Sequence, residues 1–320
     1  MSREPRFLDS PLPSLRQARS VPATMGLVLL ALLPGTAASV LAFGPGLLLN
    51  LALAAVLALA VEAAVLALRG AALKPALTDL SAPLAGVLFA LALPPSAPWW
   101  MLLVGIVAAI AVAKHLFGGL GHNPFNPAMV GVAVVVLAFP YEYSQWTVPG
   151  HWDAVSQATP LARIREGTQS ALALSELREA IVLAPWAWIA AAHALGGLFL
   201  LALRVIPWQT PAAVLGTTVL LSLPFWLFEP DRHPSPLFHL GAGALVFAAF
   251  FIVTDPVSGC TTPRGRLAFG AGVALLTLAI RRWGAFPDAV AFAVLLMNSA
   301  APLLDRLLRP RWFGEQRGAP

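Results

Sequence analysis

The chain has 320 residues, of which 58% are hydrophobic and 11% are charged, and its formal net charge at pH 7 is +5. Soluble domains carry about 25% charged residues, so this composition excludes a sizeable soluble domain and indicates a protein that crosses the lipid bilayer several times. The basic residues stand at the ends of apolar segments and form no stripe, so nucleic acid is not expected as a partner. Cys260 is the one cysteine, which excludes a disulfide within the chain, and no metal site or catalytic residue is predicted.

Ten apolar segments follow one another along the chain, five on each side of a polar stretch. The first is longer than the apolar core of a cleaved signal peptide and is therefore predicted to be a transmembrane helix. A bilayer core needs about 20 apolar residues, and several of the segments are shorter than this. The predicted spans are 21–42, 47–68, 76–93, 99–113 and 127–139, then 180–203, 211–228, 238–253, 267–280 and 288–304.

The two halves resemble each other at an offset of 161 residues. At this offset 84–89 aligns with 245–250, Pro95 falls on Pro256, and the apolar runs continue in step. Chance similarity between apolar runs is the alternative, but the matched helix breakers favour a true repeat. Because each repeat holds an odd number of spans, the second enters the membrane in the opposite orientation. The predicted fold class is an all-α polytopic membrane protein of about ten transmembrane helices, arranged as two inverted five-helix repeats.

This arrangement divides the chain into five parts. They are a cytoplasmic N-terminus (1–20), the first repeat (21–140), a periplasmic loop (141–179), the second repeat (180–305) and a cytoplasmic C-terminus (306–320). With both termini in the cytoplasm, 14 of the 20 Lys and Arg residues lie inside, as the positive-inside rule requires. The pair Arg281 and Arg282 lies on the wrong side of the membrane for this rule.

Proline and glycine interrupt the apolar segments at three places where polar side chains are also found. Asn126, Asp255 and Asp288 stand in these breaks. Backbone that is not helical is tolerated near the hydrocarbon only where protein buries it or where it lines a polar cavity, so these residues are candidates for an ion site or for contacts with a second flavin. Helix capping and ordinary surface turns are the alternatives. Glu62 in the second span either extends to the cytoplasmic surface or is functional.

The polar loop contains a hydroxyl residue in a setting that suits covalent modification. Thr159 is preceded by Asp153, Ser156 and Ala158 and followed by Pro160. Pro160 biases Thr159 toward an extended backbone, and the small neighbours would let this stretch enter the cleft of a modifying enzyme. The alternative is a plain linker between two membrane halves, because a pattern this short is only moderately specific.

Several longer stretches resemble one known family. The spacing of Asp153, Ser156, Ala158 and Thr159 looks like the motif that flavin transferases modify. Four further stretches resemble the RnfD family, the D subunits of Rnf-type ion-translocating electron transport complexes. They are 119–131 (GLGHNPFNPAMVG), 254–258 (TDPVS), 261–267 (TTPRGRL) and 286–298 (FPDAVAFAVLLMN). The resemblance covers nearly the whole chain in the right order.

The resemblance implies a membrane subunit of a ferredoxin/NAD oxidoreductase complex in the bacterial inner membrane, inactive on its own. It implies FMN bound covalently through its phosphate to Thr159, with Asp153, Ser156 and Ala158 completing the motif. A non-covalent riboflavin is expected by similarity to NqrB. The implied partners are the other Rnf-type subunits, which carry flavin and iron–sulfur centres, a flavin transferase for maturation, and the lipid bilayer. The central loop is shorter than in many members, which suggests that a neighbouring subunit covers the flavin.

Three other functions remain open from the sequence. The chain could be an NqrB-like subunit of a sodium-pumping NADH:quinone reductase. It could be a small-solute channel or transporter with the same inverted repeat, although a channel has no use for the Thr159 motif. It could also be a scaffold for other redox subunits. If Thr159 is not the attachment site, Thr147, Ser156 and Thr168 are the alternatives.

Overall fold

The computed structural model describes residues 19–155, 159–162, 185–286 and 288–309, with the backbone alone for 152–155. The first half contains α1 (Val21–Phe43), α2 (Gly46–Leu68), α3 (Leu73–Leu77), α4 (Ser81–Leu91), α5 (Trp99–Ile106), the π-helix η1 (Val107–His115), α6 (Pro127–Ala138) and α7 (Pro140–Ser144). The strands β1 (Thr147–Val148) and β2 (His151–Val155) follow. The second half contains α10 (Pro185–Ala202), α11 (Gln209–Phe228), α12 (Pro236–Gly241), α13 (Leu245–Phe251), α14 (Pro263–Trp283) and α15 (Val290–Leu307).

The structure is mostly helical, as expected for a polytopic membrane protein. Within the described ranges, five helices are long and apolar enough to cross a bilayer: α1, α2, α10, α11 and α15. The span predicted at 267–280 lies in the 21-residue helix α14, which carries Arg264, Arg266, Arg281 and Arg282 near its ends. The remaining predicted spans are shorter or divided, and that predicted at 238–253 forms two helices, α12 and α13. The ten crossings, the inverted repeats and the domain limits stay predictions. The all-α description needs one correction, because β1 and β2 form an antiparallel hairpin in the polar loop.

Several helices begin at a polar residue with proline in the first turn. Ser20, Asn126, Ser235 and Thr262 each accept a hydrogen bond from a backbone N–H in the turn that follows. Proline suits this position because the first N–H groups of a helix have no partner within it. Local sequence therefore determines the points at which α1, α6, α12 and α14 start, and Asn126 is a capping residue.

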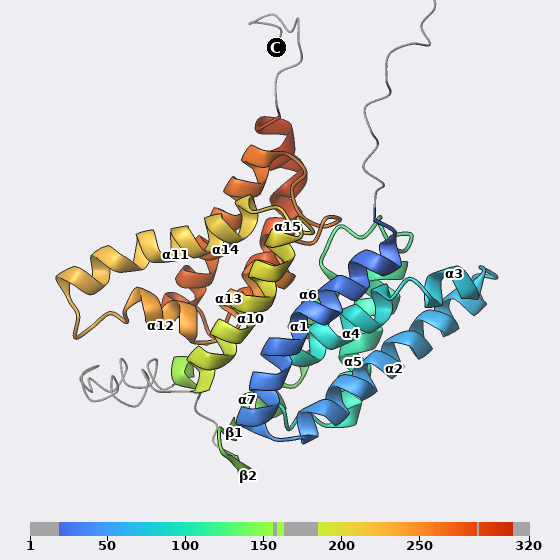
Figure 1. Cartoon of the computed structure of the whole chain (residues 1–320), viewed down its shortest axis with the longest axis horizontal. Coiled ribbons are helices and arrows are strands. Elements are labelled where there is room, and N and C mark those ends of the chain that lie inside the picture. Colours follow the sequence, from blue (N-terminus) through green and yellow to red (C-terminus); the bar gives the residue numbers. More distant parts are fainter. Residues whose placement is uncertain (1–18, 156–158, 163–184, 287, 310–320) are drawn as a thin grey trace, which may run out of the picture.

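Helices α1 and α10 lie side by side at the centre of the molecule (Figure 1). Small residues permit this contact. A Cβ atom added to Gly196 would stand 1.8 Å from the carbonyl oxygen of Ala31, and one added to Gly35 would stand 2.3 Å from the His193 ring. Close approach through small residues is a common way for membrane helices to associate. Lipid tails are as apolar as the side chains, so the hydrophobic effect does not drive the helices together and close packing does.

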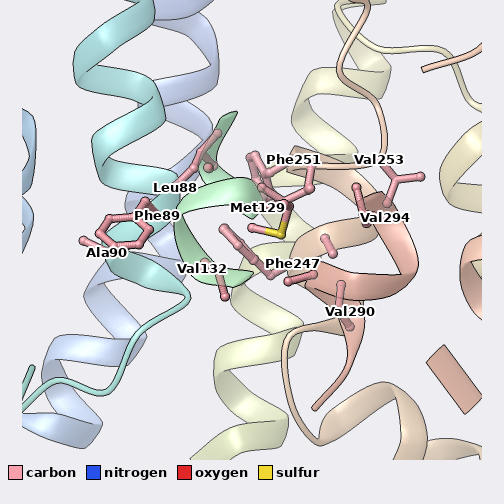
Figure 2. Close-up of a cluster of buried hydrophobic side chains, with 14 of the residues drawn as sticks. Leu88, Phe89, Ala90, Met129, Val132, Phe247, Phe251, Val253, Val290 and Val294 are labelled. Carbon is pink, nitrogen blue, oxygen red and sulfur yellow. The ribbon is translucent and has the colours of Figure 1, made fainter. Parts of the chain in front are cut away.

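The short helices α4, α6 and α13 meet the long helix α15 in a buried apolar core (Figure 2). Phe89, Met129 and Phe247 lie in it, from three different helices, and Phe89 is fully buried. The core therefore joins elements from both halves of the chain. In Figure 1 the two ends of the described chain, before α1 and after α15, lie at one end of the molecule, and the hairpin β1–β2 lies at the other.

Candidate functional site

Thr159 lies at the start of a helical turn formed by residues 160–162. Its hydroxyl oxygen accepts a hydrogen bond from the backbone N–H of Ala162 at 3.2 Å. Thr159 is half-buried, whereas Pro160 and Leu161 are buried. The turn is therefore packed against the protein, and the threonine stands at its edge.

Only part of the predicted modification motif can be placed. Asp153 lies in β2, and its side chain, like Ser156, Ala158 and Thr168, lies outside what the structure describes. Thr147, one of the alternative attachment sites, lies in β1 and is 8% exposed. The structure therefore describes the surroundings of Thr159 and Thr147, whereas Ser156 and Thr168 lie outside the described residues.

Thr159 lines a cavity of about 340 Å³, which we call the aromatic cavity. The cavity lies among the C-terminal end of α1, the N-terminal end of α10, α7 and α13. Its aromatic lining residues are Phe43, Tyr143, Trp146, Trp186, Phe247 and Phe286. Flat apolar walls with a few polar groups are typical of sites for planar ring systems.

Three of these rings form a mutual contact. The centroid of Phe43 lies 6.1 Å from that of Trp146 and 5.1 Å from that of Trp186, and the two indole centroids are 5.1 Å apart. Edge-to-face and tilted pairs at such distances stabilise by about 0.5–1.5 kcal/mol each. The three residues come from α1, the polar loop and α10, so this cluster ties the loop to both helices.

The polar wall of the aromatic cavity is formed around Asp288. One oxygen of Asp288 accepts a hydrogen bond from Ala244 N–H at 2.7 Å, and the other lies 3.4 Å from the guanidinium of Arg281. Arg281 also donates to the carbonyl oxygen of Ala242 at 3.2 Å. Arg281 therefore has a structural role in this wall. Burial, with a smaller effect from the Asp288 charge, raises the pKa of Tyr143 in the same wall, so its phenol stays protonated.

Gly243 permits the Thr159 turn to approach Asp288. Its φ angle of +76° favours glycine, and an added Cβ would lie 2.6 Å from Asp288 and 2.7 Å from Leu161. The glycine is thus required by backbone conformation and by space at once.

A second cavity of about 760 Å³ lies toward the opposite ends of α1 and α10, and we call it the basic cavity. Its walls include Thr24 of α1 and Leu200 of α10. Its charged and amide lining residues include Lys114, Asn123, Asn126, Arg204, Asp255 and Arg266. Three cations against one carboxylate make this cavity suited to a polar or anionic ligand.

Asn126 and Asp255, two of the three polar residues singled out from the helix breaks, meet in its wall. The amide nitrogen of Asn126 lies 3.4 Å from an oxygen of Asp255, which also accepts from the Ser258 hydroxyl at 2.7 Å. Asn298 of α15 joins them, accepting from Asn126 N–H at 3.0 Å and donating to the carbonyl oxygen of Ser258 at 2.9 Å. Asp288, the third, belongs to the aromatic cavity.

Sequence reasoning missed some of the residues that complete these sites. Trp146 and Trp186 line the aromatic cavity, and their presence beside an expected flavin is a signal that could have been used. Asn298 is an amide within an apolar helix, which is a second usable signal. Glu62 does not extend to the surface, because it is 1% exposed and pairs with Lys114.

A comparison with known proteins bears on what these sites do. A family model described as the NQR2, RnfD, RnfE family matches residues 9–314. The chain belongs to this family. The resemblance drawn from the sequence motifs is thereby confirmed.

Individual members of the family are similar over almost their whole length. A protein of Aeromonas hydrophila is 42% identical over 342 residues, covering 95% of this chain and 98% of its own. One of Pseudomonas aeruginosa is 46% identical over 327 residues, covering 95% of each chain. One of Aliivibrio salmonicida is 39% identical over 349 residues, covering 98% of this chain and 99% of its own. Each is named as the D subunit of an ion-translocating oxidoreductase complex.

Proposed function

We propose that this chain, as the D subunit of a membrane-bound ion-translocating oxidoreductase complex, carries FMN on Thr159 and relays electrons through it. We assign the chain this place in the complex because relatives that are 42% and 46% identical to it are named as the D subunit. Their names favour this role over an NqrB-like one. The flavin rests on a different observation, which is that Thr159 opens onto the aromatic cavity.

The residues of the aromatic cavity fit an attached FMN. A phosphoester at the Thr159 hydroxyl would retain the Ala162 N–H as a hydrogen-bond donor at the start of a helical turn. Trp146, Trp186 and Phe43 offer ring faces and edges to a flat isoalloxazine system. Bound there, FMN supplies electron transfer in steps of one or two electrons, a chemistry that belongs to the cofactor. The protein holds the ring, limits its contact with water and keeps a protonated Tyr143 beside it.

The proposed orientation in the inner membrane, with cytoplasmic termini and a periplasmic loop, is supported by the positions of the chain ends and the hairpin. The described chain ends lie on one side and the hairpin that precedes Thr159 on the other, as expected if the termini are cytoplasmic and the loop is periplasmic. The order of long and short helices in the two halves supports the inverted repeat, since α4 and α13 stand at the positions aligned by the offset of 161 residues. Other members of the complex would cover the flavin, and a flavin transferase would attach it.

The basic cavity is suited to a second, non-covalent flavin of the riboflavin type. Its volume of about 760 Å³ accommodates a ring system with a polar side chain, and Trp208 stands in its wall. Asn123 and Asn126 offer amide groups to hydroxyls and ring nitrogens. Acid precipitation of the purified complex should therefore release a flavin even when FMN stays attached to the chain.

The test of the attachment site is flavin fluorescence of the denatured chain in a gel, after expression with a flavin transferase. Thr159→Ala should abolish the fluorescence, and Thr159→Ser should retain it because the hydroxyl remains. Thr147→Ala is the matched control and should leave it unchanged, since Thr147 is buried in β1. Intact mass of the chain should give one FMN adduct. Persistent fluorescence in Thr159→Ala would move the site to another hydroxyl, and an unmodified mass in the native complex would end the proposal.

A further inference from the structure

The first half of the chain holds a buried charged cluster around Glu62, a residue that lines neither of the two cavities. Glu62 lies in α2 and is 1% exposed. One of its oxygens, Oε1, accepts a hydrogen bond from Lys114 Nζ at 2.5 Å and lies 3.0 Å from His115 Nε2. Both partners come from the last turn of η1 and are themselves buried. Ionisable groups inside a membrane protein are costly, and π-helices are often found at functional sites.

A chain of hydrogen bonds connects this cluster to a residue nearer the protein surface. Lys114 Nζ donates to the Ser81 hydroxyl at 2.7 Å, and that hydroxyl donates to Asp79 at 2.5 Å. Asp79 is half-buried, so the chain connects a partly accessible carboxylate to a fully buried one. Leu80, between Asp79 and Ser81, has a φ angle of +65°, a strained conformation for a residue other than glycine. Strained backbone held by its surroundings is concentrated at functional positions.

The charges around Glu62 come from a small number of groups. Lys114 balances Glu62, and Asp79 is one hydroxyl further away. From the end of its own helix, Arg69 donates to the carbonyl oxygen of His115 at 2.6 Å. Other helices also pack against α2. Neither α1 nor α5 contains a charged residue, and Lys74 of α3 is exposed.

One atom of the cluster has no partner among the described residues. Glu62 Oε2 is buried and makes no hydrogen bond there. A buried carboxylate oxygen without a donor is unfavourable, and a bound proton relieves this because a carboxylic acid is neutral. A metal cation fits less well, since the Lys114 ammonium already occupies the other oxygen.

Lys114 stands between Glu62 and the basic cavity. Both Lys114 and Ser81 line that cavity, so the ammonium faces the carboxylate on one side and the cavity space on the other. Negative charge arriving in the cavity would attract the ammonium and weaken its hold on Glu62. The pairing of Lys114 therefore depends on the charge state of whatever the cavity contains.

We propose that this cluster is a proton-binding site, in which Glu62 takes up one proton when negative charge enters the basic cavity. Lys114 gives one of its protons to Glu62 and regains one from the Ser81 hydroxyl, which in turn takes a proton that water supplies through Asp79, so Lys114 ends as an ammonium. The cluster changes from neutral to one positive charge, which balances the one negative charge in the cavity. Removal of that charge reverses the path and releases the proton. The inference rests on the proposed redox role, because an arriving electron supplies the negative charge.

The test is infrared difference spectroscopy of the purified complex, reduced minus oxidised, in H₂O and in D₂O. Reduction should produce a carboxylic acid C=O band that shifts in D₂O, and Glu62→Gln should lose it. Glu229→Gln is the matched control, because Glu229 is a surface residue, and it should keep the band. Absence of a D₂O-sensitive carboxylic acid band in the unaltered complex would overturn the proposal without any variant.

A second readout separates this site from a merely structural ion pair. Lys114→Arg retains the charge and should keep the band, whereas Lys114→Met should produce it before reduction, because Glu62 then lacks a counter-charge. A band in Glu62→Gln equal to that of the unaltered complex would also overturn the proposal. Failure of the redox role itself would appear separately, as an unchanged visible spectrum on reduction and as a chain without FMN.

Discussion

The aromatic cavity and the basic cavity are built on the same two helices but have opposite chemistry. Phe43 of α1 and Trp186 of α10 line the first, whereas Thr24 and Leu200 of the same helices line the second. The helices are therefore antiparallel, and one packed pair supports both sites. The difference between the sites lies in what surrounds the pair, which is a set of aromatic rings at one end and three cations with several amides at the other. A flat ring suits the first, and a polar or anionic group suits the second.

The strongest way to break both cavities together is to separate the helix pair. In Gly196→Ala the new Cβ would meet the Ala31 carbonyl oxygen at 1.8 Å, and a backbone atom cannot move aside as a side chain can. We expect the free energy of unfolding to fall by about 3 kcal/mol or more. Thermal unfolding of the detergent-purified complex measures this. Gly216→Ala in α11 is the control, since nothing lies within 4 Å of the added atom. An equal loss in both variants would contradict the close contact.

A change confined to the aromatic cavity is Asp288→Ala. It removes the acceptor of the Ala244 N–H and the counter-charge of the buried Arg281. We expect a loss of about 2 kcal/mol in stability and a lower content of covalent FMN, with the flavin of the basic cavity retained. Fluorescence in a gel and acid extraction measure the two flavins separately. Asp231→Ala, at an exposed position, should change neither. A parallel fall in both flavins would show that the cavities are not independent.

The corresponding change in the basic cavity is Asn298→Ala. It leaves the N–H of Asn126 and the carbonyl oxygen of Ser258 without their partner, at a cost of about 1–3 kcal/mol. The flavin released by acid should decrease, and the covalent FMN should stay. Ser299→Ala is the neighbouring control, and it should alter stability by less than about 0.5 kcal/mol because Ser299 is exposed. Loss of the covalent FMN instead would reverse the assignment of the two sites.

The smallest expected effect comes from Trp186→Phe in the aromatic cluster. A phenyl ring keeps most of the contact with Phe43 and Trp146, so stability should fall by about 1 kcal/mol or less and FMN should remain attached. Thermal unfolding and the fluorescence of the denatured chain check the two parts. Trp188→Phe is the exposed control. A complete loss of FMN in Trp186→Phe would mean that the indole itself is needed.

The sequence predicted the elements that depend on local signals. The start of α6 at Pro127 was predicted at the observed residue, and long apolar runs mark α1, α2 and α11, whereas α14 begins at Pro263, four residues before the predicted span. The short helices were predicted less well. The span expected at 238–253 is interrupted because the φ angle of Gly243 and its contact with Asp288 are set by tertiary structure, which hydropathy does not report. The hairpin β1–β2 lacks the apolar alternation by which strands are predicted.

The sites were predicted unevenly for a similar reason. Thr159 carries a local motif, and the structure places it at a cavity without testing the modification. The meeting of Asn126 and Asp255 depends on residues 129 positions apart, so spacing alone could not reveal it. The ion pair of Glu62 with Lys114 also depends on packing between distant helices. The sequence shows that these charged residues are present, but it does not show which residues they pair with.

The π-helix η1 has a consequence for how this protein could have arisen. In a π-helix each backbone hydrogen bond joins residues five apart, whereas in an α-helix it joins residues four apart. A π-turn therefore contains one extra residue, which corresponds to a single inserted codon. In an α-helix each residue advances the side chains by about 100° around the axis, so deleting that residue would turn Lys114 and His115 away from Glu62 together. Without the extra residue the helix would still contain Lys114 and His115, but Glu62 would be left as an unpaired buried acid. The register of the π-helix η1 is thus what keeps this buried charge pair together.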